Sequence, residues 1–128
     1  MAAVSAHLKT VSLRPDFNMA YHVWQPAGPV RAGVLLLHGF GEHSGRYDDV
    51  ARSLAERGIL VIAPDARGHG RSGGRRGHVL KFNEYLDDLD QLQDRLLPEL
   101  GLVPSWFVLG HSMGGLMALR YILRHGPR

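Results

Sequence analysis

The sequence contains no cysteine and no long hydrophobic run. The absence of cysteine excludes a disulfide framework and a thiol nucleophile. No apolar stretch approaches the ~20 residues of a membrane-spanning helix. The first residues do not show the basic segment and apolar core of a secretory signal peptide. We therefore expect a cytoplasmic protein, and the 45% hydrophobic and 21% charged residues indicate a globular one.

Several kinds of ligand are not expected. The eight histidines are dispersed and lack the spacing of a zinc motif, so neither a metal site nor another cofactor is predicted. The net charge is +3, and 13 of the 15 basic residues are arginine. These arginines are scattered and belong to no aromatic and basic module, so nucleic-acid binding is not predicted.

A glycine-rich segment matches the sequence pattern of a dinucleotide-binding site but lacks the strand and helix that such a site requires. Residues 68–73 read G-x-G-x-x-G, and Asp88 follows at a distance suitable for a ribose contact. However, four residues separate the segment from the preceding strand, and no helix begins at its end. Asp88 also falls within a helical pattern instead of at the end of a second strand. We reject a dinucleotide site.

The order of apolar patterns predicts an α/β fold. We expect the following elements: two strands around a turn within 7–25, a strand ending at Leu37, a helix closed by Gly58, a strand over 59–63, a loop over 64–78, a helix capped by Asn83 and ended by Pro98, a strand over 106–109, and a helix over 113–125. This order predicts a largely parallel sheet with helices on both faces.

The most informative segment is Gly110-His111-Ser112-Met113-Gly114. It reads G-x-S-x-G between an expected strand and an expected helix, the pattern of a nucleophile elbow. Such a turn strains the backbone at the serine, and glycines two residues away on either side avoid clashes. The helix that begins after Ser112 directs the Met113 N–H towards negative charge developing on a substrate.

A second oxyanion donor is predicted from an earlier loop. Residues 34–37 form a continuous apolar run, typical of a strand buried on both faces. The run leads into His38-Gly39-Phe40-Gly41, where the glycines allow the backbone to turn. We expect the Phe40 N–H to point at the oxyanion, a contact typically worth about 2.7–4 kcal/mol of transition-state stabilisation.

Three blocks together carry a family resemblance: residues 37–47 (LHGFGEHSGRY), 65–72 (DARGHGRS) and 110–115 (GHSMGG). In this order and spacing they closely resemble the monoacylglycerol lipase and lysophospholipase branch of the α/β-hydrolases, of the serine aminopeptidase S33 or hydrolase-4 type. The resemblance extends over nearly the whole chain from about Met19.

The resemblance implies roles for five residues. Ser112 matches the nucleophile, and the backbone amides of Phe40 and Met113 match the oxyanion hole. Glu42 and Arg46 match polar positions near the mouth of the site. Two interpretations of Arg46 stay open: it helps to bind a glycerol-like head group, or it forms a salt bridge that orders the loop.

Other polar residues near these motifs are expected to be structural. His38 and His111 flank the chemistry, but the resemblance does not make either the general base. Asp65 and Arg67 are expected to fix the loop after the preceding strand. His125 is the only histidine after Ser112, and it lies three turns along the same helix, too far to reach the serine oxygen.

The chain departs from the family pattern in its length. The partners of an elbow serine normally follow it as Asp or Glu and then His, yet sixteen residues follow Ser112 and none is acidic. We therefore interpret residues 1–128 as an incomplete α/β-hydrolase domain. It would lack the cap and the segment with the catalytic acid and histidine. Its last strand should present an unpaired apolar edge.

Two functions follow. In the complete protein, the resemblance implies cleavage of the ester of a monoacylglycerol or lysophospholipid through an acyl-enzyme intermediate, with peripheral membrane contact through the cap. The alternative is a catalytically inactive short chain that binds lipids or serves as a partner subunit.

Overall fold

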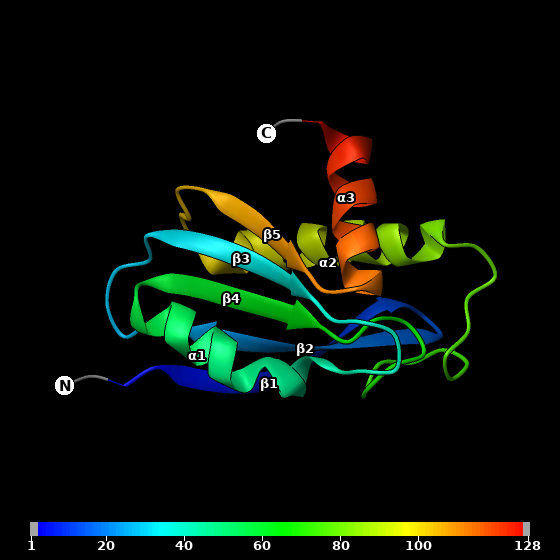
Figure 1. Ribbon diagram of the computed structural model, residues 1–128, viewed down its shortest axis with the longest axis horizontal. Coiled ribbons are helices and arrows are strands. Elements are labelled where there is room, and N and C mark those ends of the chain that lie inside the picture. The colour runs from blue at the N-terminus through cyan, green and yellow to red at the C-terminus, as the bar shows by residue number, and fades with distance from the viewer. Residues whose placement is uncertain (1–2, 127–128) are drawn as a thin grey trace.

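A computed structural model describes residues 3–126 and contains the predicted elements in the predicted order (Figure 1). They are β1 (Ser5–Arg14), β2 (Phe17–Gln25), β3 (Ala32–Leu37), the 3-10 turn η1 (Ser44–Tyr47), α1 (Asp48–Glu56), β4 (Ile59–Pro64), α2 (Asn83–Leu100), β5 (Trp106–Gly110) and α3 (Met113–His125).

The described strands form one mixed sheet in the order β1-β2-β4-β3-β5. The hairpin strands β1 and β2 are antiparallel, and β2 pairs antiparallel with β4. Strands β4, β3 and β5 run parallel to one another. Because the carboxyl ends of parallel strands share one edge of a sheet, the loops after β3, β4 and β5 meet there (Figure 1).

Helices cover both faces of the sheet, as predicted. Along β4, Val61 and Ala63 pack into the cluster that contains α1 residues, whereas Leu60 and Ile62 pack into a cluster with α2 residues. Side chains alternate between the two faces of a strand, and both faces are apolar here because each is covered. Helix α3 packs beside α2 on the second face.

Two details of α2 differ from the prediction. Asn83 is the first helical residue and not the N-cap, a position that Phe82 occupies without a side-chain hydrogen bond. The Glu84 and Tyr85 N–H groups of the first turn donate to the Lys81 and Phe82 carbonyls, at 3.0 Å in both cases, so they do not need an Asn cap. Pro98 lies inside the last turn and does not end the helix.

Only two residues of α2 follow Pro98, so the distortion that a proline causes in a helix is confined to its end. Gly101, with φ 72°, is the residue that leaves the helical conformation. A left-handed φ costs glycine little, so glycine is the usual residue after a helix.

Strand β5 is an edge strand of the described sheet, and its outer surface is apolar, as predicted. Several large apolar side chains of β5 and α3 are exposed: Trp106, Phe107, Leu109, Leu116, Leu119, Ile122 and Leu123. We call these seven residues the outer face. Within residues 3–126, no helix is both long and apolar enough to cross a bilayer.

Candidate active site

Ser112 sits on a strained turn between β5 and α3. Its φ of 56° and ψ of −116° make it the one non-glycine residue with positive φ in the described chain. Such a conformation costs on the order of 1–3 kcal/mol in a residue with a side chain, and it persists only where the surroundings enforce it. The strain predicted at this serine is therefore present.

Close packing explains both glycines of the elbow. A Cβ on Gly110 would lie 2.2 Å from the carbonyl oxygen of Gly114, and a Cβ on Gly114 would lie 2.0 Å from that of Leu37. Both contacts are with backbone atoms, which cannot rotate away. The turn can form against β3 only because these two positions lack a side chain.

The loop after β3 packs directly against the elbow. The His111 N–H donates to the Leu37 carbonyl at 3.1 Å. A Cβ on Gly39 would lie 3.3 Å from the His111 carbonyl oxygen. The two segments, about 70 residues apart in sequence, therefore meet backbone to backbone beside Ser112.

The predicted oxyanion donors are the backbone N–H groups of Phe40 and Met113. Within residues 3–126, neither the Phe40 N–H nor the Met113 N–H donates a hydrogen bond. Met113 is the first residue of α3, where a helix leaves its N–H groups unpaired and its dipole favours negative charge. Ser112 itself is exposed, so a substrate carbonyl has access to it.

His38 is a structural residue, as expected. The Ala66 N–H donates to its Nε2 at 2.9 Å, so Nδ1 carries the proton and donates to the Gly39 carbonyl at 2.7 Å. Burial lowers the pKa of the imidazole, which favours this neutral form. Because both ring nitrogens are occupied, His38 cannot take a proton from Ser112.

Glu42 holds the loop after β3 in place. Its Oε1 accepts the Tyr47 hydroxyl at 2.6 Å and the Gly39 N–H at 2.9 Å. Its Oε2 pairs with Arg46 at 3.1 Å. The Tyr47 hydroxyl, then the Gly39 amide, and also the Arg46 charge lower the pKa of Glu42 to about 2. The carboxylate is thus ionised at neutral pH, and it lies 3.6 Å from His111 Nδ1.

Arg46 has the features that both of its interpretations require. It pairs with Glu42, which orders the loop, while its side chain remains 68% exposed. An exposed guanidinium keeps free N–H groups for hydroxyl or phosphate oxygens.

Asp65 and Arg67 have the contacts of structural residues. The Asp65 carboxylate accepts the backbone N–H groups of Ser44 and Arg71 at 2.7 and 3.0 Å. Arg67 binds Asp88 with two hydrogen bonds, of 2.8 and 3.0 Å. Asp88 is 1% exposed and inside α2, so the carboxylate of the rejected dinucleotide motif is already engaged.

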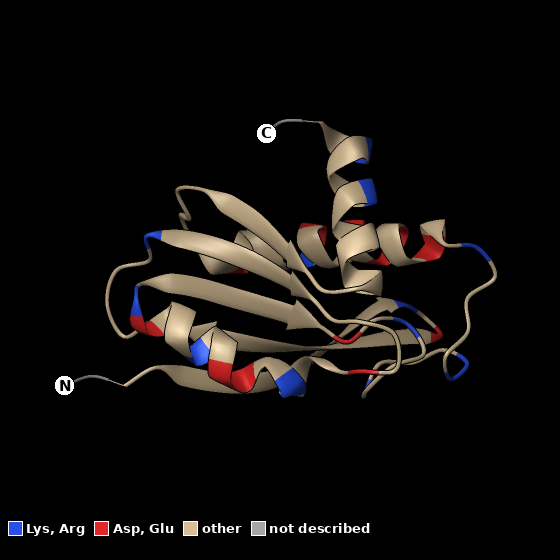
Figure 2. Cartoon of the chain, in the orientation of Figure 1, with Lys and Arg blue, Asp and Glu red and all other residues tan. Residues whose placement is uncertain are grey.

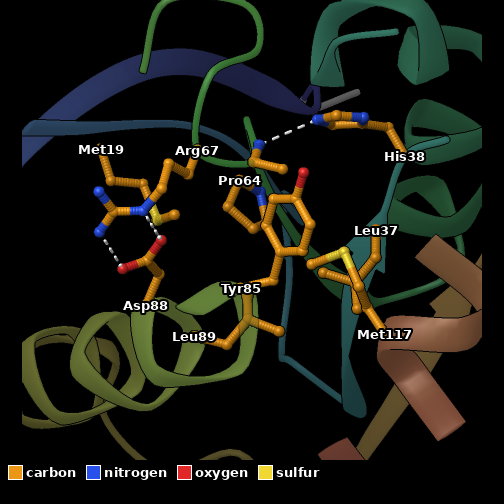
Figure 3. Close-up of a pocket in the computed structure, with 10 residues that line it drawn as sticks. Met19, Leu37, His38, Pro64, Arg67, Tyr85, Asp88, Leu89 and Met117 are labelled. Atoms are coloured by element: carbon orange, nitrogen blue, oxygen red, sulfur yellow. Dashed lines mark hydrogen bonds and ion pairs between the residues drawn. The ribbon is translucent and has the colours of Figure 1, made fainter. Parts of the chain in front are cut away.

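The cavity beneath the site is small. It measures about 10 Å³, room for about one water molecule. Figure 3 shows Met117 and Leu37 on one side of it, Tyr85 on another, and the Arg67–Asp88 pair at its far end. This cavity is far too small for an acyl chain.

His125 belongs to a different part of the molecule. Its Nε2 contacts the Asp90 carboxylate, and Arg124 pairs with Asp87 and Asp90 at 2.7 and 2.9 Å. These contacts fasten the C-terminal end of α3 to α2. The elbow is at the other end of α3, in agreement with the expectation that His125 does not serve Ser112.

Two residues of the site were missed by the sequence analysis. Tyr47 appeared there only as the last residue of the block 37–47, without a role, yet its hydroxyl binds Glu42. His69, which is 4% exposed, packs against the rings of Phe40 and His38, with centroids 5.2 Å away in both cases. No spacing rule identifies such contacts, because they depend on how separate loops fold together.

Residues 28–128 match the Hydrolase_4 family, described as serine aminopeptidase, S33. The chain belongs to this family. It is 42% identical over 108 residues to the monoacylglycerol lipase of Mycolicibacterium smegmatis, an alignment that covers 84% of this chain and 38% of that protein. It is 43% identical over 96 residues to the monoglyceride lipase of Homo sapiens, covering 75% and 31%. The chain thus spans less than half the length of these relatives.

Solved structures agree with this assignment. A lipase in its open form superposes with a TM-score of 0.81 at 29% identity, over 97% of this chain and 42% of that one. A thermostable carboxyl esterase from Bacillus coagulans, in complex with glycerol, gives a TM-score of 0.79 at 26% identity, over 95% and 41%. The described residues form part of an α/β-hydrolase fold.

Proposed function

We propose that Ser112 is the nucleophile of a serine hydrolase that cleaves carboxylic esters of monoacylglycerols or lysophospholipids, within a protein that contains a catalytic acid and histidine besides this sequence. Relatives named monoacylglycerol lipase, monoglyceride lipase and phospholipase support this substrate class. The observation that carries the proposal is the strained Ser112 beside two unengaged backbone donors.

The proposed reaction has two stages. Ser112 Oγ attacks the ester carbonyl carbon while a histidine outside this sequence takes its proton. The Phe40 and Met113 N–H groups bind the oxyanion of the tetrahedral intermediate. The intermediate collapses to an acyl-enzyme, and the alcohol leaves with the proton from the histidine. Water then attacks the acyl group, releases the fatty acid and restores the serine.

The 128 residues by themselves should be a poor catalyst. Within residues 3–126, the Ser112 side chain forms no hydrogen bond to a histidine or a carboxylate. Losing a triad base costs on the order of 10⁶ in kcat. Unengaged oxyanion donors can still leave about 10³–10⁴-fold catalysis over water. Glu42 and Arg46 would border the head group, with Arg46 supplying the exposed donors.

The decisive test restores what this sequence lacks. The chain is fused to the segment of the Mycolicibacterium smegmatis monoacylglycerol lipase that follows the region aligned with this chain. We expect a fluorophosphonate probe to label Ser112 and the fusion to hydrolyse a monoacylglycerol. Ser112→Ala should abolish both. Ser105→Ala, an exposed serine just before β5, is the matched control and should change neither.

Two outcomes would contradict the proposal. Full hydrolysis by the Ser112→Ala fusion would remove Ser112 from the mechanism. Hydrolysis of p-nitrophenyl esters by the unfused chain at more than about one-thousandth of the fusion's rate would mean that the base lies within these residues.

A second candidate function is that of a non-catalytic partner or lipid-binding subunit. The outer face favours a partner, because seven large apolar side chains there are exposed and patches of this kind usually mark an interaction surface. A short chain isolated from its source with this mass, 14.2 kDa, would favour this candidate. A larger mass would favour the hydrolase.

A further inference from the structure

The loop that joins β4 to α2 carries charge of one sign. Residues 66–82, which we call the basic loop, contain five arginine or lysine residues and no aspartate or glutamate. Two of the five are engaged within the protein. Arg67 turns inward to Asp88, and Arg76 donates to backbone carbonyls of the same loop.

The other three cations face solvent. Arg71, Arg75 and Lys81 are exposed, and within residues 3–126 none of their side chains forms a hydrogen bond or ion pair. Figure 2 shows basic positions in blue along this loop. An unpaired surface cation retains its full attraction for an external anion.

The same region also exposes large apolar side chains. Leu80, next to Lys81, is 84% exposed, and Phe40 is 62% exposed. The Phe40 ring packs on His69 of the basic loop and lies against Gly77, so the basic loop supports the loop after β3. Exposed leucine beside unpaired cations is the composition of surfaces that bind at a lipid interface.

The basic loop lies on the catalytic side of the molecule. It begins just after β4, and β3, β4 and β5 are parallel. It therefore shares a sheet edge with the loop after β3 and with the turn between β5 and α3, as Figure 1 shows at the right of the sheet. A surface bound by this loop would be near the serine.

We propose that the basic loop docks this edge of the protein on an anionic lipid surface. Arg71, Arg75 and Lys81 bind lipid phosphate and carboxylate groups, and Leu80 enters the acyl boundary. Each cation near an anionic membrane surface strengthens binding, and a buried apolar side chain adds to this. The orientation brings Ser112 towards the lipid esters of the proposed function, although the binding itself does not depend on catalysis.

A lipid surface fits this loop better than a nucleic acid does. Bases stack on exposed aromatic rings, but Phe82, which is the one Phe, Tyr or Trp among residues 66–82, packs on Tyr85. Leu80 would gain nothing on a phosphate backbone but is stabilised when a bilayer takes it out of water.

Vesicle flotation with the 128-residue chain tests the proposal, because aggregated protein sinks while bound protein floats. The vesicles are phosphatidylcholine with or without phosphatidylserine. We expect flotation only with phosphatidylserine, and it should weaken as salt is raised. The variant Arg71→Gln/Arg75→Gln/Lys81→Gln should bind on the order of 100-fold more weakly. Leu80→Ser should weaken binding less.

The matched control removes three exposed cations elsewhere. Lys9→Gln/Arg31→Gln/Arg57→Gln has the same net charge as the loop variant, but its changes lie on β1, before β3 and after α1. It should float like the unmodified chain. Equal loss in both variants, equal flotation with phosphatidylcholine alone, or tighter binding to a single-stranded oligonucleotide would overturn the proposal. Fluorophosphonate labelling of the fusion is unaffected by these results, so the two proposals can fail separately.

Discussion

The elbow joins β5 to α3, and the outer face runs along the same strand and helix, but only the backbone of the elbow is closely packed by other described residues. Around Ser112, glycines, carbonyls and the Glu42 carboxylate fit one another within ordinary contact distances. On the outer face, Leu123 is 70% exposed and Phe107 59% exposed. The backbone of the elbow is closely packed, whereas the outer face exposes the kind of side chain that normally lies inside a protein.

This difference separates two requirements of a serine hydrolase. In the proposed mechanism, the nucleophile and its oxyanion donors depend on backbone contacts among β3, β5 and α3. The base and the acid of that mechanism would come from residues outside this sequence. Electrostatic stabilisation can therefore be built separately from proton transfer.

The largest expected effect on stability comes from adding one methyl group to a glycine of the elbow. Gly114→Ala places a Cβ 2.0 Å from the Leu37 carbonyl oxygen, so β3 and the elbow must separate. We expect it to lower the free energy of unfolding by about 3 kcal/mol. Gly115→Ala is the matched control, because its Cβ would meet Gly110 at an ordinary 3.5 Å.

Urea unfolding of both variants measures this effect. Alanine favours a helix over glycine by about 1 kcal/mol, so Gly115→Ala should leave stability unchanged or raise it. Equal destabilisation by the two changes would show that the elbow does not require a glycine at position 114.

Substitutions on the outer face should change aggregation of the chain more than its free energy of unfolding. In the unfused chain, Leu119→Gln/Leu123→Gln should reduce aggregation while changing the free energy of unfolding by only about 0.5 kcal/mol, since both side chains are already exposed. In the fusion, the same change should destabilise the protein if the added part covers this face. Val50→Gln, which changes an exposed side chain of α1, is the control in both proteins.

Light scattering and thermal unfolding would follow these variants. Unchanged aggregation of the Leu119→Gln/Leu123→Gln chain would mean that the outer face does not cause self-association. An equal response of the chain and the fusion would mean that the added part leaves the face uncovered.

The sequence predicted the elements, the α/β architecture, the exposed edge and the strain at Ser112, because hydrophobic period and turn chemistry are local properties. It failed at the ends of α2 and at polar side-chain contacts, which a hydrophobic pattern does not reveal. Asn83 resembled an N-cap, but the Glu84 and Tyr85 N–H groups donate to the Lys81 and Phe82 carbonyls. Pro98 resembled a helix end, but the helix runs to Leu100. The Tyr47 hydroxyl binds Glu42, a contact that the spacing of apolar residues does not predict.

The smallest expected effect concerns the charge of Glu42. Its pKa is about 2 in the folded protein and 4.5 ordinarily, so its contribution to stability is fully present above about pH 4.5 and is lost as the pH falls towards 2. Glu42→Gln keeps an oxygen for the Gly39 and Tyr47 donors but removes the charge that pairs with Arg46. The urea midpoints of Glu42→Gln and the unmodified chain should therefore differ at neutral pH and converge towards pH 2. Glu56→Gln, which changes an exposed carboxylate, is the control. A difference in urea midpoint between Glu42→Gln and the unmodified chain that does not change with pH would indicate that the shape of Glu42, and not its charge, holds the loop beside the elbow.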